Sequence, residues 1–225
     1  MKIIHKKIKI ILLNINNKLK ICKTELNKNK IEFLSVNFSS GINNFRRKYN
    51  RQKELIIQAI KIKKKKIVVL DATAGLGKDS FILASYGYKV FMIEKNKIIY
   101  HLLKNGLERA YQDINLNKWI KKKMILFYGN SLNFIQSKKI FPDVIYLDPM
   151  FLNKKKSFSK KDMFILKIIL KKDQQTPNLL KQSLKFSRKK VVVKRPLKSP
   201  YLENIKPTYA IFGKKYRFDI YIINH

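Results

Sequence analysis

From Ile67 onward, short runs of β-branched residues alternate with longer stretches of helical periodicity, and this alternation leaves few folds open to the chain. A strand that returns to a parallel neighbour needs a long crossover, usually a helix, so the pattern predicts a parallel sheet flanked by helices. The expected strands span residues 67–71, 89–93, 124–127, 144–147 and 190–193, and the expected helices span 79–86, 97–111, 131–137 and 160–186, the last broken at Pro177.

The pattern changes after the fifth strand. The apolar segments 208–212 and 216–222 follow each other with only Gly213-Lys214-Lys215 between them, which predicts an antiparallel hairpin. Five parallel strands closed by a hairpin resemble the seven-stranded sheet of methyltransferases more than a plain dinucleotide-binding sheet. The expected fold class is therefore α/β and Rossmann-like, that of class I S-adenosylmethionine-dependent methyltransferases, with a mostly parallel seven-stranded sheet that ends in a β-hairpin.

A basic run, Lys63 to Lys66, separates this pattern from a less regular N-terminal part. There, residues 31–38 are rich in strand-forming side chains, and residues 52–62 show helical spacing after Arg46-Arg47-Lys48. We therefore expect a small N-terminal appendage over residues 1–65 and the catalytic domain over residues 66–225. The first thirty residues match no pattern that assigns them a role.

The charge of the chain favours a polyanionic partner. Its 225 residues include 51 Lys and Arg against 14 Asp and Glu, a formal net charge of +37. Nucleic acid is the favoured partner, and membrane headgroups are the alternative. Because abundant Lys, Ile and Asn with few Gly also indicate an AT-rich codon pool, which scatters Lys over any surface, the charge alone does not decide the function.

Several sequence features exclude whole classes of protein. The chain has no run of eighteen apolar residues, and no small-residue cleavage site follows its apolar N-terminal stretch. A single cysteine, Cys22, excludes an internal disulfide framework and a cysteine-rich zinc site. We therefore expect a cytoplasmic protein with no membrane span and no metal.

A glycine-rich loop, Asp71-Ala72-Thr73-Ala74-Gly75-Leu76-Gly77-Lys78-Asp79, lies between the first expected strand and its helix. Glycines there let the backbone turn sharply and approach a ligand closely, at the sheet edge where open α/β folds bind. A phosphate-binding loop is disfavoured, because its first glycine is missing and Asp79 replaces the hydroxyl residue. A nicotinamide loop stays open, since Ser80 is tolerable as the third small residue. Asp71, four residues before Gly75, favours S-adenosylmethionine.

Two further acidic residues end expected strands. Glu94 is placed to accept hydrogen bonds from both ribose hydroxyls of an adenosine moiety. Asp148-Pro149-Met150-Phe151 resembles the (Asp/Asn/Ser)-Pro-Pro-(Tyr/Phe) motif of methyltransferases that modify exocyclic amines, with Met150 in place of the commoner second proline. Asp148 and the Pro149 carbonyl can accept both N–H groups of such an amine while Phe151 stacks on the base. Each motif alone also suits an ordinary turn, so their combination carries the prediction.

Together with Val191 to Pro196 and Arg217 to Tyr221, these strings resemble the small-subunit rRNA guanine-N2 methyltransferase family called RsmJ, over about residues 31 to 222. The resemblance implies transfer of a methyl group from S-adenosylmethionine to N2 of a guanosine in 16S rRNA. It implies that the cofactor site is lined by Lys78, Asp79, Glu94, Lys95, Asn130, Ser131 and Asp148. Lys78 and Lys95 stand where Arg is expected, which keeps the charge but not bidentate contacts, and Asn130 stands where Ser is expected.

Two basic segments fit an RNA surface. Lys194-Arg195 follows the fifth expected strand, and Lys154-Lys155 follows Phe151. Both are expected to contact phosphates beside a flipped base, although a solvated lysine loop explains the second equally well. We therefore expect a monomeric enzyme that acts on 16S rRNA or the small ribosomal subunit. The alternatives are an adenine-N6 or other nucleic-acid amino-methyltransferase, and a non-catalytic RNA-binding ribosome assembly factor.

Overall fold

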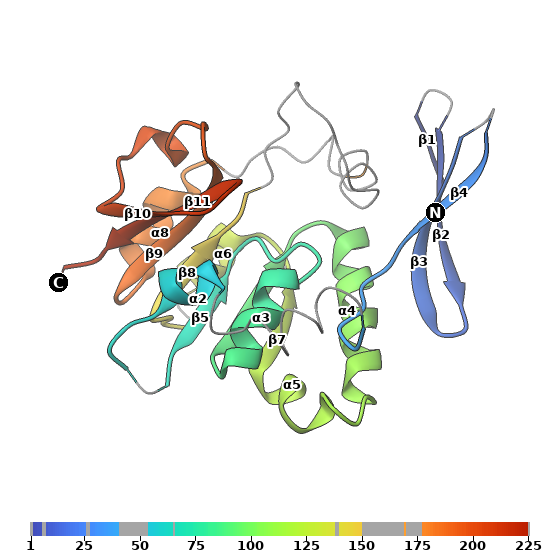
Figure 1. The fold of residues 1–225 in the computed structure, drawn as a ribbon, viewed down its shortest axis with the longest axis horizontal. Helices are drawn as coiled ribbons and strands as arrows, with labels where there is room; N and C mark the ends of the chain where they lie inside the picture. The colour runs from blue at the N-terminus through green and yellow to red at the C-terminus, as the bar shows by residue number, and fades with distance from the viewer. Residues whose placement is uncertain are drawn as a thin grey trace.

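Two β-sheets and the helices around them make up the fold (Figure 1). A computed structural model of the chain describes residues 2–5, 8–25, 28–40, 54–64, 66–137, 140–149, 169 and 177–224. Within these residues, a seven-stranded sheet has the order β10-β11-β9-β8-β5-β6-β7, and a four-stranded sheet has the order β1-β2-β3-β4. The chain termini lie at opposite ends of the molecule in Figure 1.

The seven-stranded sheet confirms the expected parallel strands and the closing hairpin. Its parallel strands are β5 (Val68–Asp71), β6 (Lys89–Glu94), β7 (Met124–Tyr128), β8 (Val144–Leu147) and β9 (Lys190–Pro196), and the hairpin is β10 (Tyr209–Phe212) and β11 (Tyr216–Ile222). Strand β9 runs three residues beyond the expected end at 193, because Lys194, Arg195 and Pro196 pair with Phe218, Arg217 and Tyr216 of β11.

The helices confirm most of the expected helical segments. They are α2 (Leu55–Ile60), α3 (Lys78–Tyr86), α4 (Lys97–Tyr111), α5 (Asn117–Lys123), α6 (Ser131–Gln136), α8 (Leu179–Phe186) and the 3-10 helix η3 (Leu202–Asn204). Helix α5 was not expected. Ile120 is its one buried residue, so its sequence shows no helical spacing of apolar residues. Of the expected helix 160–186, α8 is confirmed, whereas residues 160–168 and 170–176 lie outside the described residues. No described helix is both long and apolar enough to cross a membrane.

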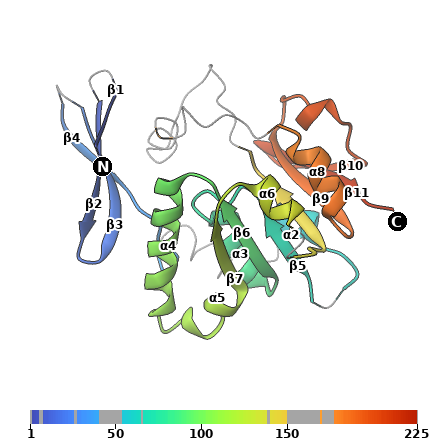
Figure 2. The same ribbon diagram turned by 180° about the vertical axis from the view of Figure 1, so that it is seen from behind.

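The sheet is buried on both faces. Successive residues of a strand point to opposite sides, so Val69 and Val144 join one core cluster while Leu70 and Ile145 join another. Helices α2, α3 and α4 supply the first cluster and are in front in Figure 1, whereas α6 and α8 lie over the opposite face in Figure 2. Burial on both faces explains why these strands read as continuous apolar runs.

Within the described residues, the N-terminal part of the chain up to Leu34 forms a sheet that the sequence did not predict as a whole. It consists of β1 (Lys2–His5), β2 (Ile8–Ile15), β3 (Lys18–Glu25) and β4 (Lys28–Leu34), all antiparallel. The expected strand at 31–38 is correct only as far as Leu34. The sheet packs against α4, where the Asn105 amide accepts from the Leu19 N–H at 2.9 Å and donates to the Asn17 carbonyl at 3.0 Å. The division at residue 65 stays a prediction.

Gly106 of α4 lets the segment that leaves β4 cross the helix closely. A Cβ at this position would lie 2.6 Å from Val36 Cβ and 3.3 Å from the Val36 carbonyl oxygen. The neighbouring Arg109 donates to that carbonyl, so the segment is held in place and has little room to retreat.

Gly106→Ala is expected to destabilise the protein. The substitution gains up to about 1 kcal/mol of helix propensity, but overpacking against Val36 costs about 1–3 kcal/mol. Urea unfolding should therefore show a lower free energy of unfolding, and Lys104→Ala on the exposed face of the same helix should change it by no more than about 0.5 kcal/mol. A Gly106→Ala protein that is more stable than the wild type would contradict this packing.

Candidate functional site

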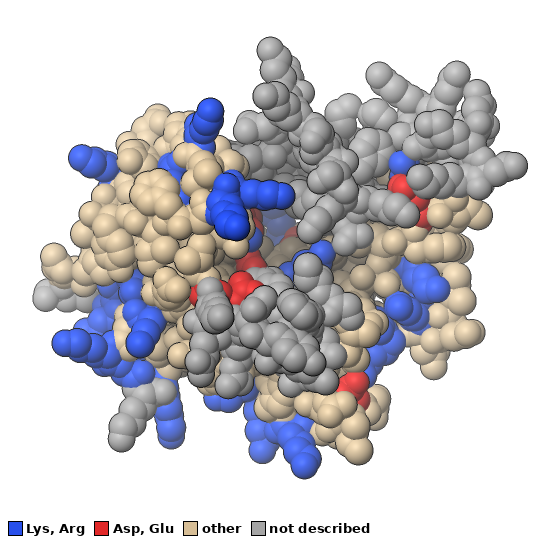
Figure 3. Space-filling model, viewed as in Figure 1, with Lys and Arg blue, Asp and Glu red and all other residues tan. Residues whose placement is uncertain are grey.

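The acidic residues that end the strands meet at one edge of the sheet. Strands β8, β5 and β6 are parallel neighbours, so the loops that follow them lie side by side. These loops carry Asp148, the glycine-rich segment 72–77 and the residues after Glu94. Acidic side chains are visible in a hollow near the centre of the face shown in Figure 3. Open α/β sheets bind their ligands at this edge.

The glycine-rich loop takes the conformation that its glycines permit. Gly75 and Gly77 have φ angles of 53° and 70°, in the left-handed region that favours glycine, and Gly77 precedes the first residue of α3. A Cβ at Gly77 would also lie 2.7 Å from the Leu103 side chain. The Ala74 N–H donates to the Ile93 carbonyl at 3.1 Å, which ties the loop to β6.

Glu94 links this loop to β6. Its side chain is buried, and its two carboxylate oxygens accept from the backbone N–H groups of Gly75 at 2.9 Å and Asn96 at 2.7 Å. Each carboxylate oxygen can accept a second hydrogen bond. A contact between Glu94 and the ribose of a cofactor stays a prediction.

Asp71 faces the inside of the loop. Its carboxylate is buried and accepts from the Thr73 N–H at 3.1 Å and from the Ser80 hydroxyl. Burial raises the pKa of Asp71 to about 7, although the hydrogen bonds from Ser80 and Thr73 oppose the rise. In this arrangement Asp71 supports the loop, and a direct contact with the cofactor stays a prediction.

A hydrogen-bonded cluster joins α3, β8 and β9. Lys194 Nζ lies 2.7 Å from Asp79 Oδ2 and 3.0 Å from Asp148 Oδ2, and the Tyr146 hydroxyl donates to Asp79 at 2.8 Å. The Asp148 N–H donates to the Thr73 hydroxyl at 2.6 Å. The position of Asp148 is therefore fixed from two sides.

The charges in this cluster depend on one another. Burial lowers the pKa of Lys194, but Asp79 and Asp148 outweigh that effect and raise it well above its usual range. Burial raises the pKa of Asp148, and the Lys194 ammonium opposes the rise. Lys194 thus pairs with two carboxyl groups at the edge where a cationic ligand is expected to bind. Among the described residues, no group of three or more His, Cys, Asp and Glu could hold a metal ion.

The remaining expected cofactor residues also lie at this edge. Asn130 begins α6 by accepting from the Leu132 N–H at 2.8 Å, and the buried Ser131 hydroxyl donates to the Ala72 carbonyl. Lys78 is the first residue of α3, and Lys95 directly follows β6. The structure thus places all four expected positions next to the glycine-rich loop or at the neighbouring strand ends.

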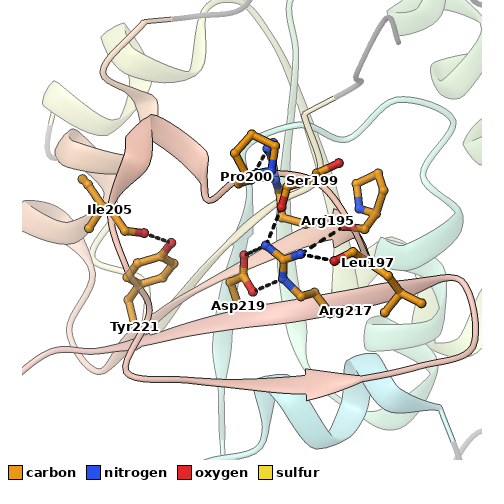
Figure 4. Close-up of polar contacts among 9 residues, drawn as sticks. Arg195, Leu197, Ser199, Pro200, Ile205, Arg217, Asp219 and Tyr221 are labelled. Atoms are coloured by element: carbon orange, nitrogen blue, oxygen red, sulfur yellow. Dashed lines mark hydrogen bonds and ion pairs between the residues drawn. The ribbon is translucent and has the colours of Figure 1, made fainter. Parts of the chain in front are cut away.

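Arg195 and Lys194 have different surroundings despite being adjacent. The Arg195 guanidinium is buried and donates to the Pro200 carbonyl, while Arg217 donates to the Leu197 and Ser199 carbonyls and to Asp219 (Figure 4). The two arginines therefore hold the turn after β9, and Arg195 could reach a phosphate only if that turn rearranged. Of the other expected site residues, Pro149 follows Asp148, whereas Phe151, Lys154 and Lys155 lie outside the described residues.

Sequence reasoning assigned no role to three hydroxyl residues of the site: Thr73, Ser80 and Tyr146. Each one hydrogen-bonds an acidic residue of the site: the Thr73 hydroxyl accepts from the Asp148 N–H, and the Ser80 and Tyr146 hydroxyls donate to the carboxylates of Asp71 and Asp79, respectively. The sequence did indicate that these hydroxyls form hydrogen bonds, because a hydroxyl in a buried motif needs a partner. The partners themselves could not be read from the sequence.

Known proteins match the chain along most of its length. The family described as "Putative SAM-dependent methyltransferase" matches residues 1–223. Ribosomal RNA small subunit methyltransferase J of Buchnera aphidicola subsp. Schizaphis graminum is 47% identical over 192 residues, which are 84% of this chain and 77% of that protein. Its namesake from Pseudoalteromonas atlantica is 39% identical over 208 residues, 89% of this chain and 81% of that protein.

A solved structure also matches the chain over most of its length. The crystal structure of an S-adenosylmethionine-dependent methyltransferase from Neisseria gonorrhoeae matches with a TM-score of 0.71 at 29% identity, over 94% of this chain and 81% of that one. Together with the family match, it confirms the expected fold class and the expected cofactor, S-adenosylmethionine.

Asp71→Asn is expected to remove a pH-dependent cost of folding. Because the folded-state pKa of Asp71 is raised to about 7, the folded protein binds this proton more tightly than the unfolded chain does. This residue's contribution to stability is therefore present at low pH and is lost as the pH rises to about 7, by about 4 kcal/mol in all. In urea unfolding, the free energy of unfolding of Asp71→Asn should rise relative to that of the wild type from pH 4 to pH 8. If the difference between the two proteins is the same at both pH values, the carboxyl of Asp71 is not buried as described.

Proposed function

We propose that this chain, which belongs to the ribosomal RNA small subunit methyltransferase J family and is an S-adenosylmethionine-dependent rRNA methyltransferase, methylates the exocyclic N2 of a guanosine in 16S rRNA. The product is N2-methylguanosine. The observation that carries the proposal is the position of Asp148, which lies beside the glycine-rich loop and is held by Thr73 and Lys194. The proposed setting is the cytoplasm, with a monomer acting without a metal on 16S rRNA or the small subunit.

The residues at the sheet edge fit S-adenosylmethionine. When bound, this cofactor supplies a methyl group from a positively charged sulfonium. Gly75 and Gly77 allow the backbone to approach it closely, and Glu94 is positioned to accept from its ribose hydroxyls. The carboxyl groups of Asp79 and Asp148 beside Lys194 are suited to a cofactor that carries a positively charged sulfonium. The proposed lining consists of Lys78, Asp79, Lys95, Asn130, Ser131 and Asp148, with Asp71 supporting the loop.

The amine of the base needs orientation more than it needs a strong base. Its lone pair is delocalised into the ring, so it becomes nucleophilic only when its N–H groups are held out of the ring plane. Asp148 and the Pro149 carbonyl are proposed to accept these two N–H groups. Once the new N–C bond has formed, the nitrogen is acidic, and its proton can pass to Asp148 or to water.

The proposed RNA contacts differ from residue to residue. Phe151 is proposed to stack on the target base, and Lys154 and Lys155 are proposed to contact phosphates. For Lys194 we propose a positioning role instead of a phosphate contact, because its ammonium is already shared between Asp79 and Asp148. Arg195 is left out of the proposed RNA contacts because its guanidinium is buried.

Nucleoside mass spectrometry tests the reaction directly. Small-subunit rRNA that lacks the modification is incubated with the protein and labelled S-adenosylmethionine, first as naked RNA and then as assembled subunits. We expect label in N2-methylguanosine, and we expect Asp148→Ala to abolish it while thermal melting shows a folded protein. Label in methyladenosine would overturn the choice of base. Near-normal methylation by Asp148→Ala would overturn the role of this carboxylate.

Lys194→Met tests the positioning role. An ammonium within hydrogen-bonding distance lowers a carboxyl pKa by about 1–3 units, so its removal should raise the pKa of Asp148. If the ionised carboxylate is the active form, the acid limb of the kcat/KM profile should move by a similar amount to higher pH. Lys194→Arg should restore part of the wild-type profile, and Lys198→Met, at an exposed lysine of the following turn, should leave it unchanged. A lower rate with an unmoved acid limb would show that Lys194 is merely structural.

A further inference from the structure

The N-terminal sheet has two different faces. Cross-strand pairing places Ile10, Ile21 and Leu34 on the face that joins the main core, which is the inner face. By the same pairing, alternate residues form the opposite, outer face. The described outer-face side chains are Ile11, Leu13, Ile15, Lys18, Lys20, Cys22, Thr24, Ile31 and Phe33.

The outer face combines exposed apolar residues with cations. Ile31 is 59% exposed and Phe33 is 48% exposed, which is unusual for large apolar side chains on the same sheet face. Lys20 Nζ lies 5.3 Å from the centre of the Phe33 ring. The described side chains of this sheet include one acid, Glu32, and it lies on the inner face in an ion pair with Lys23. The described outer face therefore carries positive charge without an acidic partner of its own.

The cations at the edge of this face repel one another. Lys18 has a lowered pKa, first because it is partly buried and then because Arg109 and Lys20 are close. Arg109 lies where the sheet meets α4, and basic side chains are visible along this boundary at the right of Figure 3. An anion bound here would relieve the repulsion.

The sheet is also fixed relative to the catalytic domain. The two hydrogen bonds of Asn105 and the contact between Gly106 and Val36 hold the sheet on α4. A ligand on the outer face would therefore be held at a defined orientation to the active-site edge.

We infer that the outer face is a docking surface for RNA, on which Lys18 and Lys20 contact backbone phosphates and Phe33 stacks on an unpaired base. The inference rests on the proposed function, which makes an rRNA the substrate. An aromatic ring among cations on an open sheet suits single-stranded RNA. A second copy of the chain is a poorer occupant, because a two-fold interface would bring the same cations to face each other.

The experiment measures binding of a 16S rRNA transcript at several salt concentrations, with the full chain and its variants. Lys18→Glu/Lys20→Glu should weaken binding at least tenfold and reduce the slope of log affinity against log salt by about 2, one for each lost phosphate contact. The neutral pair Lys18→Gln/Lys20→Gln should show a smaller loss in the same direction. Phe33→Ala should weaken binding at least fivefold with little change in that slope.

The matched control is Lys121→Glu/Lys122→Glu on α5, which makes the same change in net charge at exposed positions outside the sheet. It should weaken binding much less than Lys18→Glu/Lys20→Glu. Equal losses in the two charge-reversed pairs would overturn the docking surface, because general attraction would then explain the binding. Affinity for S-adenosylhomocysteine and the melting temperature should be unchanged in the neutral pair and in Phe33→Ala, which separates docking from loss of the fold.

Other outcomes separate this inference from the proposed function. If the wild type methylates rRNA and the Lys18/Lys20 and Phe33 variants bind and methylate equally well, the docking surface is wrong and the function stands. If the wild type neither binds nor methylates rRNA, both are wrong. If Phe33→Ala changes the mass of the particle in sedimentation and leaves RNA affinity unchanged, the face binds a second copy instead.

Discussion

The ammonium of Lys194 is shared by two carboxylates, and the arrangement of the site depends on this one cation. Asp79 lies in the first turn of α3 and Asp148 follows β8, so both acids come from the edge where the ligand is expected to bind. Without a cation between them, the two carboxylates would repel each other. The pairing of Leu147 with Val193 places the next residue of each strand, Asp148 and Lys194, side by side. The register of β8 and β9 thus brings the Lys194 ammonium to the Asp148 carboxyl group.

The molecule presents opposite charges to its two ligands. Its net charge of +37 attracts RNA over long distances, whereas Asp79 and Asp148 bring carboxyl groups to the sheet edge where a cationic cofactor is expected. On the N-terminal sheet, Lys20 lies beside the exposed Phe33 ring and adds positive charge away from the site.

Buried arginines show that a basic residue in this chain need not serve RNA. Arg217 pairs with Asp219, whose side chain is fully buried, and both Arg195 and Arg217 donate to carbonyls of the turn after β9. A buried carboxylate without a partner would be strongly destabilising, so Asp219 requires Arg217. The carbonyls of the turn are thereby satisfied from inside the protein. Strand β9 thus carries two adjacent basic residues with different roles: Lys194 lies in the site and Arg195 holds the framework.

The sequence by itself determined the parallel strands, the closing hairpin, the glycine-rich loop and the placing of Glu94 and Asp148 at strand ends. These features are local: strand and helix periodicity, and glycine at positions with positive φ, can be read within a few neighbouring residues. The sequence also indicated the family, through strings that lie within single loops and strands. It left the first thirty residues without a role, because Ile11, Leu13 and Ile15 lie on the outer face of the sheet, and apolar residues on both faces blur the alternation that a half-exposed strand usually shows.

Only the tertiary structure decided which groups pair. It turned Asp71 towards Ser80, placed Lys194 between Asp79 and Asp148, and buried Arg195 against the Pro200 carbonyl. Lys194 and Asp79 are 115 residues apart in the chain, and Asp148 and Thr73 are 75 apart. Such contacts depend on strand order and register, which are set by packing of the whole sheet, so no local spacing in the sequence encodes them.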